Sequence, residues 1–233
     1  MVIHHQIEGD GANVVLLHGW GQNSTMMKPI QQRLSVHYRV CALDLFGFGK
    51  TEDIEDYQTF DDYVEAFHTF LVEHQLEDPI LIAHSFGARL AVRYALKYPV
   101  KALILTGAAG IRLPLTWKQK LSIRCYKIKK RLGIAQRSGS YDYQHANPFQ
   151  RKLLVQVVND DLTPYYHRLT MPVLLVWGEK DDQTPLIMGK MMEKAITKST
   201  LIVLEGDDHF AYYHQSGRFC AIVEAFLEGW CLA

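Results

Sequence analysis

Three segments of the sequence place a residue type used in hydrolytic chemistry just after an apolar run. Ser85 ends "PILIAHS", Asp181 follows "PVLLVWGEK", and His209 follows "STLIVLEGDD". A serine hydroxyl attacks a carbonyl only when a histidine takes its proton and an acid orients that histidine. These residue types, in the chain order Ser, Asp, His, indicate nucleophilic catalysis.

Ser85 stands where an apolar run passes directly into a helix-like pattern. It is therefore either a nucleophile on a sharp strand-to-helix turn or the N-cap of the helix. The sharp turn requires small residues two positions before and two after the serine. Gly87 meets this requirement, and Ala83 exceeds it by one methyl group. We favour the nucleophile and keep the helix cap as the alternative.

Position relative to the apolar runs selects the acid and the base. The chain has eleven histidines, and His209 is the one in a polar Gly/Asp loop just past the last run. Asp181 lies in an equivalent loop, with the adjacent Asp182 as its rival. We expect His84, beside the nucleophile, to pack or hydrogen bond locally.

Acyl transfer also needs two N–H donors directed at the developing oxyanion. The stretch "LLHGWGQNS" is another apolar run that leads into a glycine-rich turn. The backbone N–H groups of Trp20 and Phe86 are the candidate oxyanion-hole donors. The alternative for the glycine-rich stretch is an ordinary strand-to-helix loop.

Short apolar runs alternate with helical patterns along most of the chain. Continuous runs of this kind are typical of strands buried on both faces of a parallel sheet. The alternation predicts an α/β fold with a doubly wound, mostly parallel sheet, and "IHHQI" predicts a short antiparallel edge strand. The six runs cover 13–18, 39–45, 79–85, 101–107, 172–178 and 199–206, and the helical patterns cover 60–75, 88–98 and 216–231.

Residues 111–168 interrupt this alternation. They predict one helix over 117–132 and, after a turn-rich stretch, a second through Phe149, Leu153 and Val157. They also hold twelve Lys/Arg against three Asp/Glu, whereas the remainder of the chain holds 13 against 22. We therefore expect a helical cap inserted into a core made of 1–110 and 169–233. Its basic face is either merely solvated or attracts anionic substrates or surfaces.

Composition excludes several classes of function. The chain has 233 residues, of which 48% are hydrophobic and 21% charged, and its formal net charge is zero. This balance is typical of a soluble globular protein and gives no attraction to nucleic acid. No apolar run approaches the roughly 20 residues that span a bilayer, and the first residues lack the features of a secretory signal. We expect a cytoplasmic protein without stable membrane insertion, and its oligomeric state stays open.

The sequence gives no sign of a metal or a cofactor. The four cysteines are scattered, without a CxxC pair or metal-type spacing to histidine. Gly49-Lys50-Thr51 is similar to the end of a phosphate-binding loop, but Asp44 stands where that motif needs its first glycine. We therefore predict neither a bound metal nor a nucleotide cofactor.

Taken together, these segments resemble the α/β-hydrolase fold family over essentially the whole chain. The matching blocks are His18-Gly19-Trp20-Gly21, Asp44-x-x-Gly47-x-Gly49-x-Thr51, His84-Ser85-Phe86-Gly87, Gly178-x-x-Asp181-x-x-x-Pro185 and Asp208-His209-Phe210. The resemblance implies a sheet of about seven to eight strands with a small helical cap.

The resemblance also implies roles for individual residues. These are Ser85 as nucleophile, Asp181 as acid, His209 as base, and the Trp20 and Phe86 amides as oxyanion hole. The sequence departs from the family pattern at Ala83, where a glycine is usual. It is also short before residue 13, so that one or both of the family's first strands are expected to be missing or shortened.

The expected activity is that of a serine hydrolase cleaving a small carboxylic ester through an acyl-enzyme intermediate. The His-Gly-Trp-Gly block resembles that of small carboxylesterases. The Ser-Phe-Gly block with a helical cap is similar to carbon–carbon bond hydrolases, so these and thioesterases remain alternatives. A non-catalytic, ligand-binding member of the fold is the alternative from another class.

Overall fold

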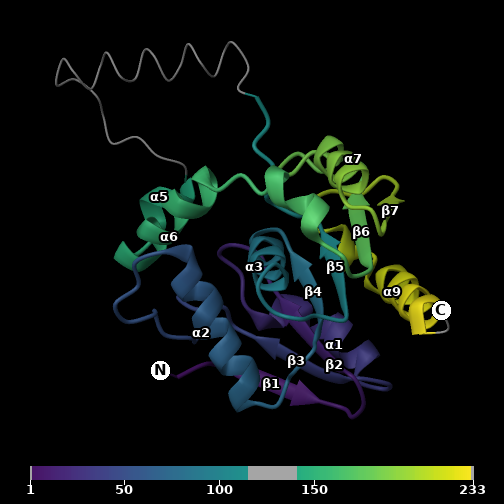
Figure 1. The fold of residues 1–233 in the computed structure, drawn as a ribbon, viewed down its shortest axis with the longest axis horizontal. Helices are drawn as coiled ribbons and strands as arrows, with labels where there is room; N and C mark the ends of the chain where they lie inside the picture. Colours follow the sequence, from purple (N-terminus) through teal and green to yellow (C-terminus); the bar gives the residue numbers. More distant parts are fainter. Residues whose placement is uncertain (1, 115–140, 232–233) are drawn as a thin grey trace.

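The computed structural model describes residues 2–114 and 141–231, which form a sheet with helices on both faces (Figure 1). All six predicted apolar runs form strands, and the antiparallel edge strand expected near the start is also present. The strands are β1 (His5–Glu8), β2 (Asn13–Leu17), β3 (Arg39–Leu43), β4 (Ile80–His84), β5 (Ala102–Thr106), β6 (Val173–Gly178) and β7 (Ser199–Leu204).

The sheet has the order β1-β3-β2-β4-β5-β6-β7. Strands β2 to β7 run parallel, and β1 pairs antiparallel with β3. From β2 the chain passes first to β3 on one side and later to β4 on the other. Open α/β sheets bind ligands at the carboxyl ends of strands beside such a reversal. The predicted doubly wound fold is confirmed, with seven strands in the described residues.

Helices pack on the two faces of the sheet in separate layers. Helices α2, α3 and α7 share one apolar cluster with Val15 and Leu17, and helices α1, α8 and α9 share the other with Val14 and Leu16. Successive residues of β2 thus bury opposite faces, as a strand covered on both sides must. The helices are α1 (Lys28–Leu34), α2 (Phe60–Glu73), α3 (Phe86–Ala95), α7 (Leu186–Ala195), α8 (Ala211–His214) and α9 (Ser216–Cys231), with 3-10 helices η1 (Ser24–Met27) and η2 (Thr163–Arg168).

The described part of the predicted cap contains two helices, α5 (Tyr141–His145) and α6 (Pro148–Asn159). Helix α6 confirms the second helix predicted in this segment, and the helix expected over 117–132 lies outside the described residues. Helix α5 differs from the turn expected there. The side chain of its last residue donates back to its first, since His145 Nδ1–H bonds to the Tyr141 carbonyl at 2.9 Å.

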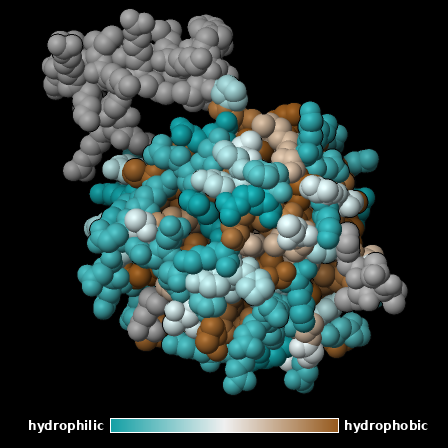
Figure 2. Space-filling view, in the orientation of Figure 1, coloured by the Kyte–Doolittle hydropathy of each residue, from teal (hydrophilic) through white to brown (hydrophobic). Residues whose placement is uncertain are grey.

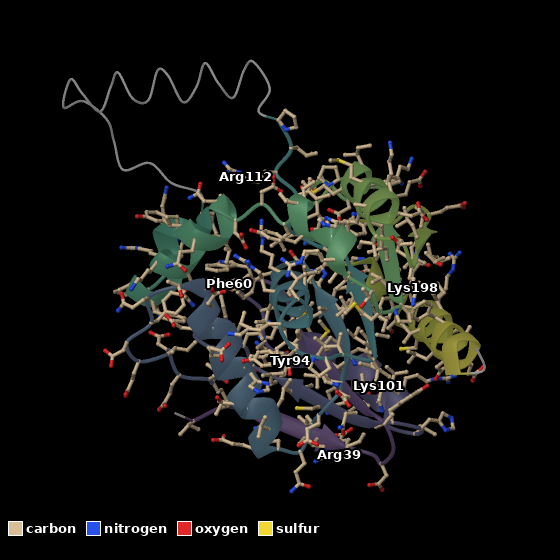
Figure 3. All side chains as sticks on the ribbon, in the orientation of Figure 1. Arg39, Phe60, Tyr94, Lys101, Arg112 and Lys198 are labelled. Atoms are coloured by element: carbon tan, nitrogen blue, oxygen red, sulfur yellow. The ribbon has the colours of Figure 1, made fainter. Side chains whose placement is uncertain are left out.

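The carboxyl ends of the strands face the segment that follows β5. In Figure 3, Arg39 and Lys101 lie in the lower half, at the amino ends of β3 and β5, whereas Arg112, beyond the carboxyl end of β5, lies in the upper half. Helices α5 and α6 lie at the upper end of α2 (Figure 1). Polar loops at this upper edge carry the predicted site residues.

The surface offers little apolar area on the face that Figure 2 displays. Hydrophilic residues cover most of it, and apolar residues appear between them in small groups. Among residues 2–114 and 141–231, no helix has both the length and the apolar character needed to cross a bilayer.

Candidate active site

Ser85 lies on a tight turn between β4 and α3 and is half-buried. Its φ of 50° and ψ of −107° are strained for a residue with a side chain. Such strain costs about 1–3 kcal/mol and persists only where the surroundings enforce it. Here the Ser85 N–H donates to the Thr106 carbonyl at 3.1 Å, and the Ser85 carbonyl accepts from Ala88 and Ala109, both at 3.2 Å. The backbone of β5 and α3 therefore holds the serine in place.

The elbow has a strict requirement for glycine at position 87. A Cβ there would lie 2.6 Å from the Leu17 carbonyl oxygen and 2.7 Å from that of His18. These are rigid backbone atoms at the end of β2, so the start of α3 packs directly on the strand that leads to Trp20. The predicted need for a small residue after Ser85 has this physical cause.

Asp181 and His209 form a buried, hydrogen-bonded pair. His209 Nδ1–H donates to Asp181 Oδ2 at 2.8 Å, and the two residues are only 5% and 4% exposed. The Thr184 hydroxyl donates to the same oxygen at 2.8 Å, and the Gln183 and Thr184 amides donate to Asp181 Oδ1. Burial alone raises the pKa of Asp181, but hydrogen bonds from His209 and Thr184 hold that pKa below its usual value. The carboxyl group is therefore ionised at neutral pH and fixes the imidazole.

The rival acid, Asp182, does not take part in this pair. Its side chain is exposed, and no hydrogen bond joins it to His209 among the described residues. The structure thus brings together Asp181 and His209 and leaves Asp182 in solvent, as the spacing before Pro185 favours.

Ser85 and His209 lie on either side of the carboxyl end of β5. Ser85 is bonded to Thr106, and a Cβ on the next residue, Gly107, would lie 3.0 Å from His209 Nδ1. The ring of His84, the residue before the serine, is 4.6 Å from the His209 ring. The Ser85 hydroxyl makes no hydrogen bond to any described residue. In unliganded active sites this bond is often long and tightens only when substrate binds.

The loop after β2 is fixed by His18. Its Nδ1–H donates to the Gly19 carbonyl at 2.7 Å, and its Nε2 accepts the Leu45 N–H at 2.9 Å. Burial lowers the pKa of His18 to about 4, so the ring is neutral at physiological pH. Because a trans peptide directs its C=O and N–H to opposite sides, a fixed Gly19 carbonyl also fixes the Trp20 N–H.

The two candidate oxyanion donors belong to loops that touch. The Trp20 and Phe86 rings are 5.4 Å apart in an edge-to-face contact, and both contact Phe48. Within the described residues, no hydrogen bond uses the N–H of Trp20 or of Phe86. Both donors are thus available to a bound group.

His18, His84 and Thr184 are site residues for which no catalytic role was predicted from the sequence. Thr184 had a local signal, because an aspartate side chain commonly accepts from backbone N–H groups just after it in a turn, which brings the following residues close to the carboxylate. For the two histidines the sequence offered only their position next to Gly19 and Ser85. Their partners come from other strands.

One group of potential metal ligands occurs in the described residues. Atoms of Asp207, Asp208 and His214 lie within 4.8 Å of one another. His214 Nδ1–H already donates to Asp207 at 2.8 Å, and this bond raises the pKa of His214. Because the hydrogen bond accounts for the grouping, we assign no metal to it.

A buried Asp-His pair beside a strained serine, at the carboxyl edge of a doubly wound sheet, is the arrangement of an α/β hydrolase. The chain belongs to the alpha/beta hydrolase family, whose sequence model matches residues 14–222. Family membership, together with the esterases among its relatives, supports hydrolase activity.

One similar curated protein is the pimeloyl-[acyl-carrier protein] methyl ester esterase of Vibrio vulnificus (strain CMCP6). It is 24% identical over 247 residues, covering 94% of this chain and 95% of the relative. Among solved structures, bromoperoxidase from Bacillus anthracis superimposes with a TM-score of 0.79 at 21% identity, covering 97% of this chain and 95% of the other.

A meta-cleavage product hydrolase from Pseudomonas fluorescens IP01 superimposes with a TM-score of 0.77. It is 23% identical and covers 97% of this chain and 94% of the other. At these identities the two solved structures establish the shared fold alone.

Proposed function

We propose that this protein is a serine hydrolase that cleaves a small carboxylic ester through an acyl-enzyme intermediate. Ser85 is the nucleophile, His209 the general base and Asp181 the acid that orients it. The buried hydrogen bond of 2.8 Å between His209 and Asp181 is the observation that carries the proposal. That bond places the proton on Nδ1 and leaves Nε2 of the neutral ring free to accept the serine proton.

The reaction begins when His209 removes the Ser85 proton as the hydroxyl oxygen attacks the ester carbonyl. The tetrahedral oxyanion is stabilised by the N–H groups of Trp20 and Phe86. His209 then protonates the departing alcohol, leaving an acyl group on Ser85. Water repeats the sequence, giving the carboxylic acid and the free serine.

Asp181 contributes by remaining ionised throughout. Its low pKa and its bonds to Thr184 keep a negative charge beside His209 while that ring carries the transferred proton. Removing this charge removes both the orientation of the ring and the stabilisation of the imidazolium.

We further propose that residues 111–168 act as a cap over the core formed by 1–110 and 169–233. Helix α6 is bound to the loop after β3, where Gln150 donates to the Gly47 carbonyl at 2.6 Å and Tyr57 donates to Gln156 at 2.7 Å. At its carboxyl end Asp160 accepts two hydrogen bonds from Arg93. These contacts hold α6 in a defined position against the core, which supports the proposed cap.

The curated methyl ester esterases among the relatives support an ester as the substrate. We therefore propose small carboxylic esters as the substrate class. Thioesters and vinylogous diketones, the substrates of a thioesterase or of a carbon–carbon bond hydrolase, serve as the competing compounds in the test.

The test combines covalent labelling with turnover. A fluorophosphonate probe should label the wild-type protein on Ser85, as mapped by mass spectrometry, and should not label Ser85→Ala. Turnover of p-nitrophenyl acetate should exceed that of an acyl-CoA and of a vinylogous diketone, and Ser85→Ala should lower ester turnover at least about 10³-fold while remaining folded.

Each failure has a distinct meaning. Wild-type esterase activity in folded Ser85→Ala would refute the nucleophile, and an absence of labelling in the wild type would favour a non-catalytic ligand-binding protein. Labelling with preferred turnover of the thioester or the diketone would keep the three residues and replace the substrate class.

A further inference from the structure

His84 is a fully buried histidine that the proposed reaction does not use. It is the last residue of β4, directly before Ser85, and it is 0% exposed. Its ring contacts the rings of His209 and Tyr212, with centroids 4.6 Å and 4.4 Å away. A titratable side chain is thus enclosed between the nucleophile's own strand and the loop of the candidate base.

The protonation of His84 follows from its one hydrogen bond. Nδ1 lies 3.1 Å from the Thr106 carbonyl oxygen, which can only accept, so Nδ1 carries the proton. The same carbonyl accepts the Ser85 N–H. Burial lowers the pKa of His84 to about 3, and the ring is therefore neutral.

In this tautomer the other ring nitrogen, Nε2, carries a lone pair that meets no partner in the described part of the chain. Nε2 of His84 is buried and makes no hydrogen bond among the described residues. The carbon bonded to it, Cδ2, lies 2.9 Å from where a Cβ on Gly19 would stand, and the rings of His209 and Tyr212 pack alongside. Leaving a buried acceptor unpaired costs about 1–3 kcal/mol, so the unpaired Nε2 of His84 needs an explanation.

We infer that His84 is a positioning residue for His209. The neutral ring of His84 packs against the His209 ring, and the unpaired lone pair of His84 places negative partial charge beside that base. This inference rests on the proposed function. It goes beyond that function by giving a role to a residue that the proposed reaction does not use.

The physical reason lies in the charge that His209 acquires. Its imidazole becomes a cation when it takes the serine proton, although the His209 side chain is only 4% exposed. The dipole of the δ-protonated His84 ring has its positive end at Thr106 and its negative end at Nε2. A partial charge within about 5 Å in a partly buried site is sufficient to change kcat about tenfold, or about 1.4 kcal/mol.

The inference predicts different effects for three substitutions. His84→Phe keeps a ring but removes the lone pair, and His84→Asn keeps a donor for Thr106 but has no acceptor at the position of Nε2. We expect both to lower kcat for p-nitrophenyl acetate about tenfold, with KM changed less than twofold. His84→Gln, whose side-chain oxygen reaches the position of Nε2, should restore kcat to within threefold of wild type.

The rate of Ser85 phosphonylation by a fluorophosphonate gives a second measure that is independent of the ester chosen. It should follow the same order, wild type and Gln above Asn and Phe, in samples whose fold is checked by circular dichroism. If His84→Phe fails to fold, the comparison of Asn with Gln still decides the matter.

Equal kcat and equal labelling rates across the folded variants would overturn the inference, since neither the ring nor the lone pair of His84 would then affect His209. It would also be overturned if Gln were as slow as Asn. Failure of the wild-type protein to label would instead refute the proposed function, and this inference with it. The wild-type and Ser85→Ala controls separate these cases.

Discussion

The orientation of the Trp20 N–H is predicted to depend on His18, which lies two residues before it. Replacing His18 with Phe keeps an aromatic ring but removes both of its hydrogen bonds. The Leu45 N–H then loses its partner, while the Gly19 carbonyl keeps a weaker bond of 3.3 Å from the Gln22 N–H.

The loss of stability follows from these two groups. An unpaired buried backbone N–H costs about 1–3 kcal/mol, and the weakened carbonyl adds up to about 1 kcal/mol. The free energy of unfolding should therefore fall by about 1–4 kcal/mol. For a chain of this size each kcal/mol lowers the Tm by about 2–4 °C, so we expect a decrease of about 2–16 °C.

The effect on activity follows from the Gly19–Trp20 peptide. Without the bond from His18 Nδ1–H, this peptide can rotate, and the Trp20 N–H no longer points reliably at the oxyanion. Removing one such donor lowers kcat about 10²–10³-fold with little change in KM. Steady-state kinetics with p-nitrophenyl acetate at 20 °C, on samples shown to be folded, measures both constants.

His18→Asn is the matched control. Its side-chain amide can still donate to the Gly19 carbonyl but cannot reach the Leu45 N–H. We expect a comparable loss of stability with kcat within about fivefold of wild type. If folded His18→Phe retained kcat within threefold of wild type, the link between His18 and the oxyanion donor would be refuted.

Two further predictions concern the acid and the stability of the fold at low pH. Asp181→Asn should lower kcat about 10³–10⁴-fold, whereas the exposed Asp182→Asn should stay within twofold, and the reverse pattern would reassign the acid. The pKa values of His18 and His84 are lowered from 6.5 to about 4 and about 3, so the unfolded chain binds these protons first as the pH falls below 6.5. Each neutral histidine therefore stabilises the fold fully above pH 6.5 and loses that contribution progressively below it. Urea unfolding should show a loss of about 2 kcal/mol per histidine between pH 7 and pH 5, and a pH-independent free energy over that range would contradict the burial of neutral rings.

The sheet could be predicted from the sequence because each buried strand is a continuous apolar run between polar loops. The predicted run at 79–85 becomes β4, and the run at 172–178 becomes β6, with ends shifted by one residue at most. The placement of Asp181 and His209 followed from the same signal, since parallel strands bring their carboxyl ends to one edge.

What the sequence could not predict depends on partners from distant parts of the chain. His18 is held by Leu45, and His84 by Thr106, across neighbouring strands whose pairing no local pattern specifies. Helix α5 was missed for a similar reason. Arg151 of α6 donates to the Tyr143 and Gln144 carbonyls, so the carbonyl groups at the carboxyl end of α5 find their donors on another helix.

The alanine at position 83 illustrates which features of a nucleophile elbow are strict. At Gly87 an added methyl group would meet the Leu17 carbonyl at 2.6 Å, and neither backbone can move without disturbing the sheet. Ala83 stands inside β4 between Leu17 and Leu105, and its methyl group joins the apolar cluster beneath α3. The strained φ of Ser85 persists beside it. The strict requirement for glycine therefore comes from contact with backbone after the serine, and before the serine a methyl group contributes to the core.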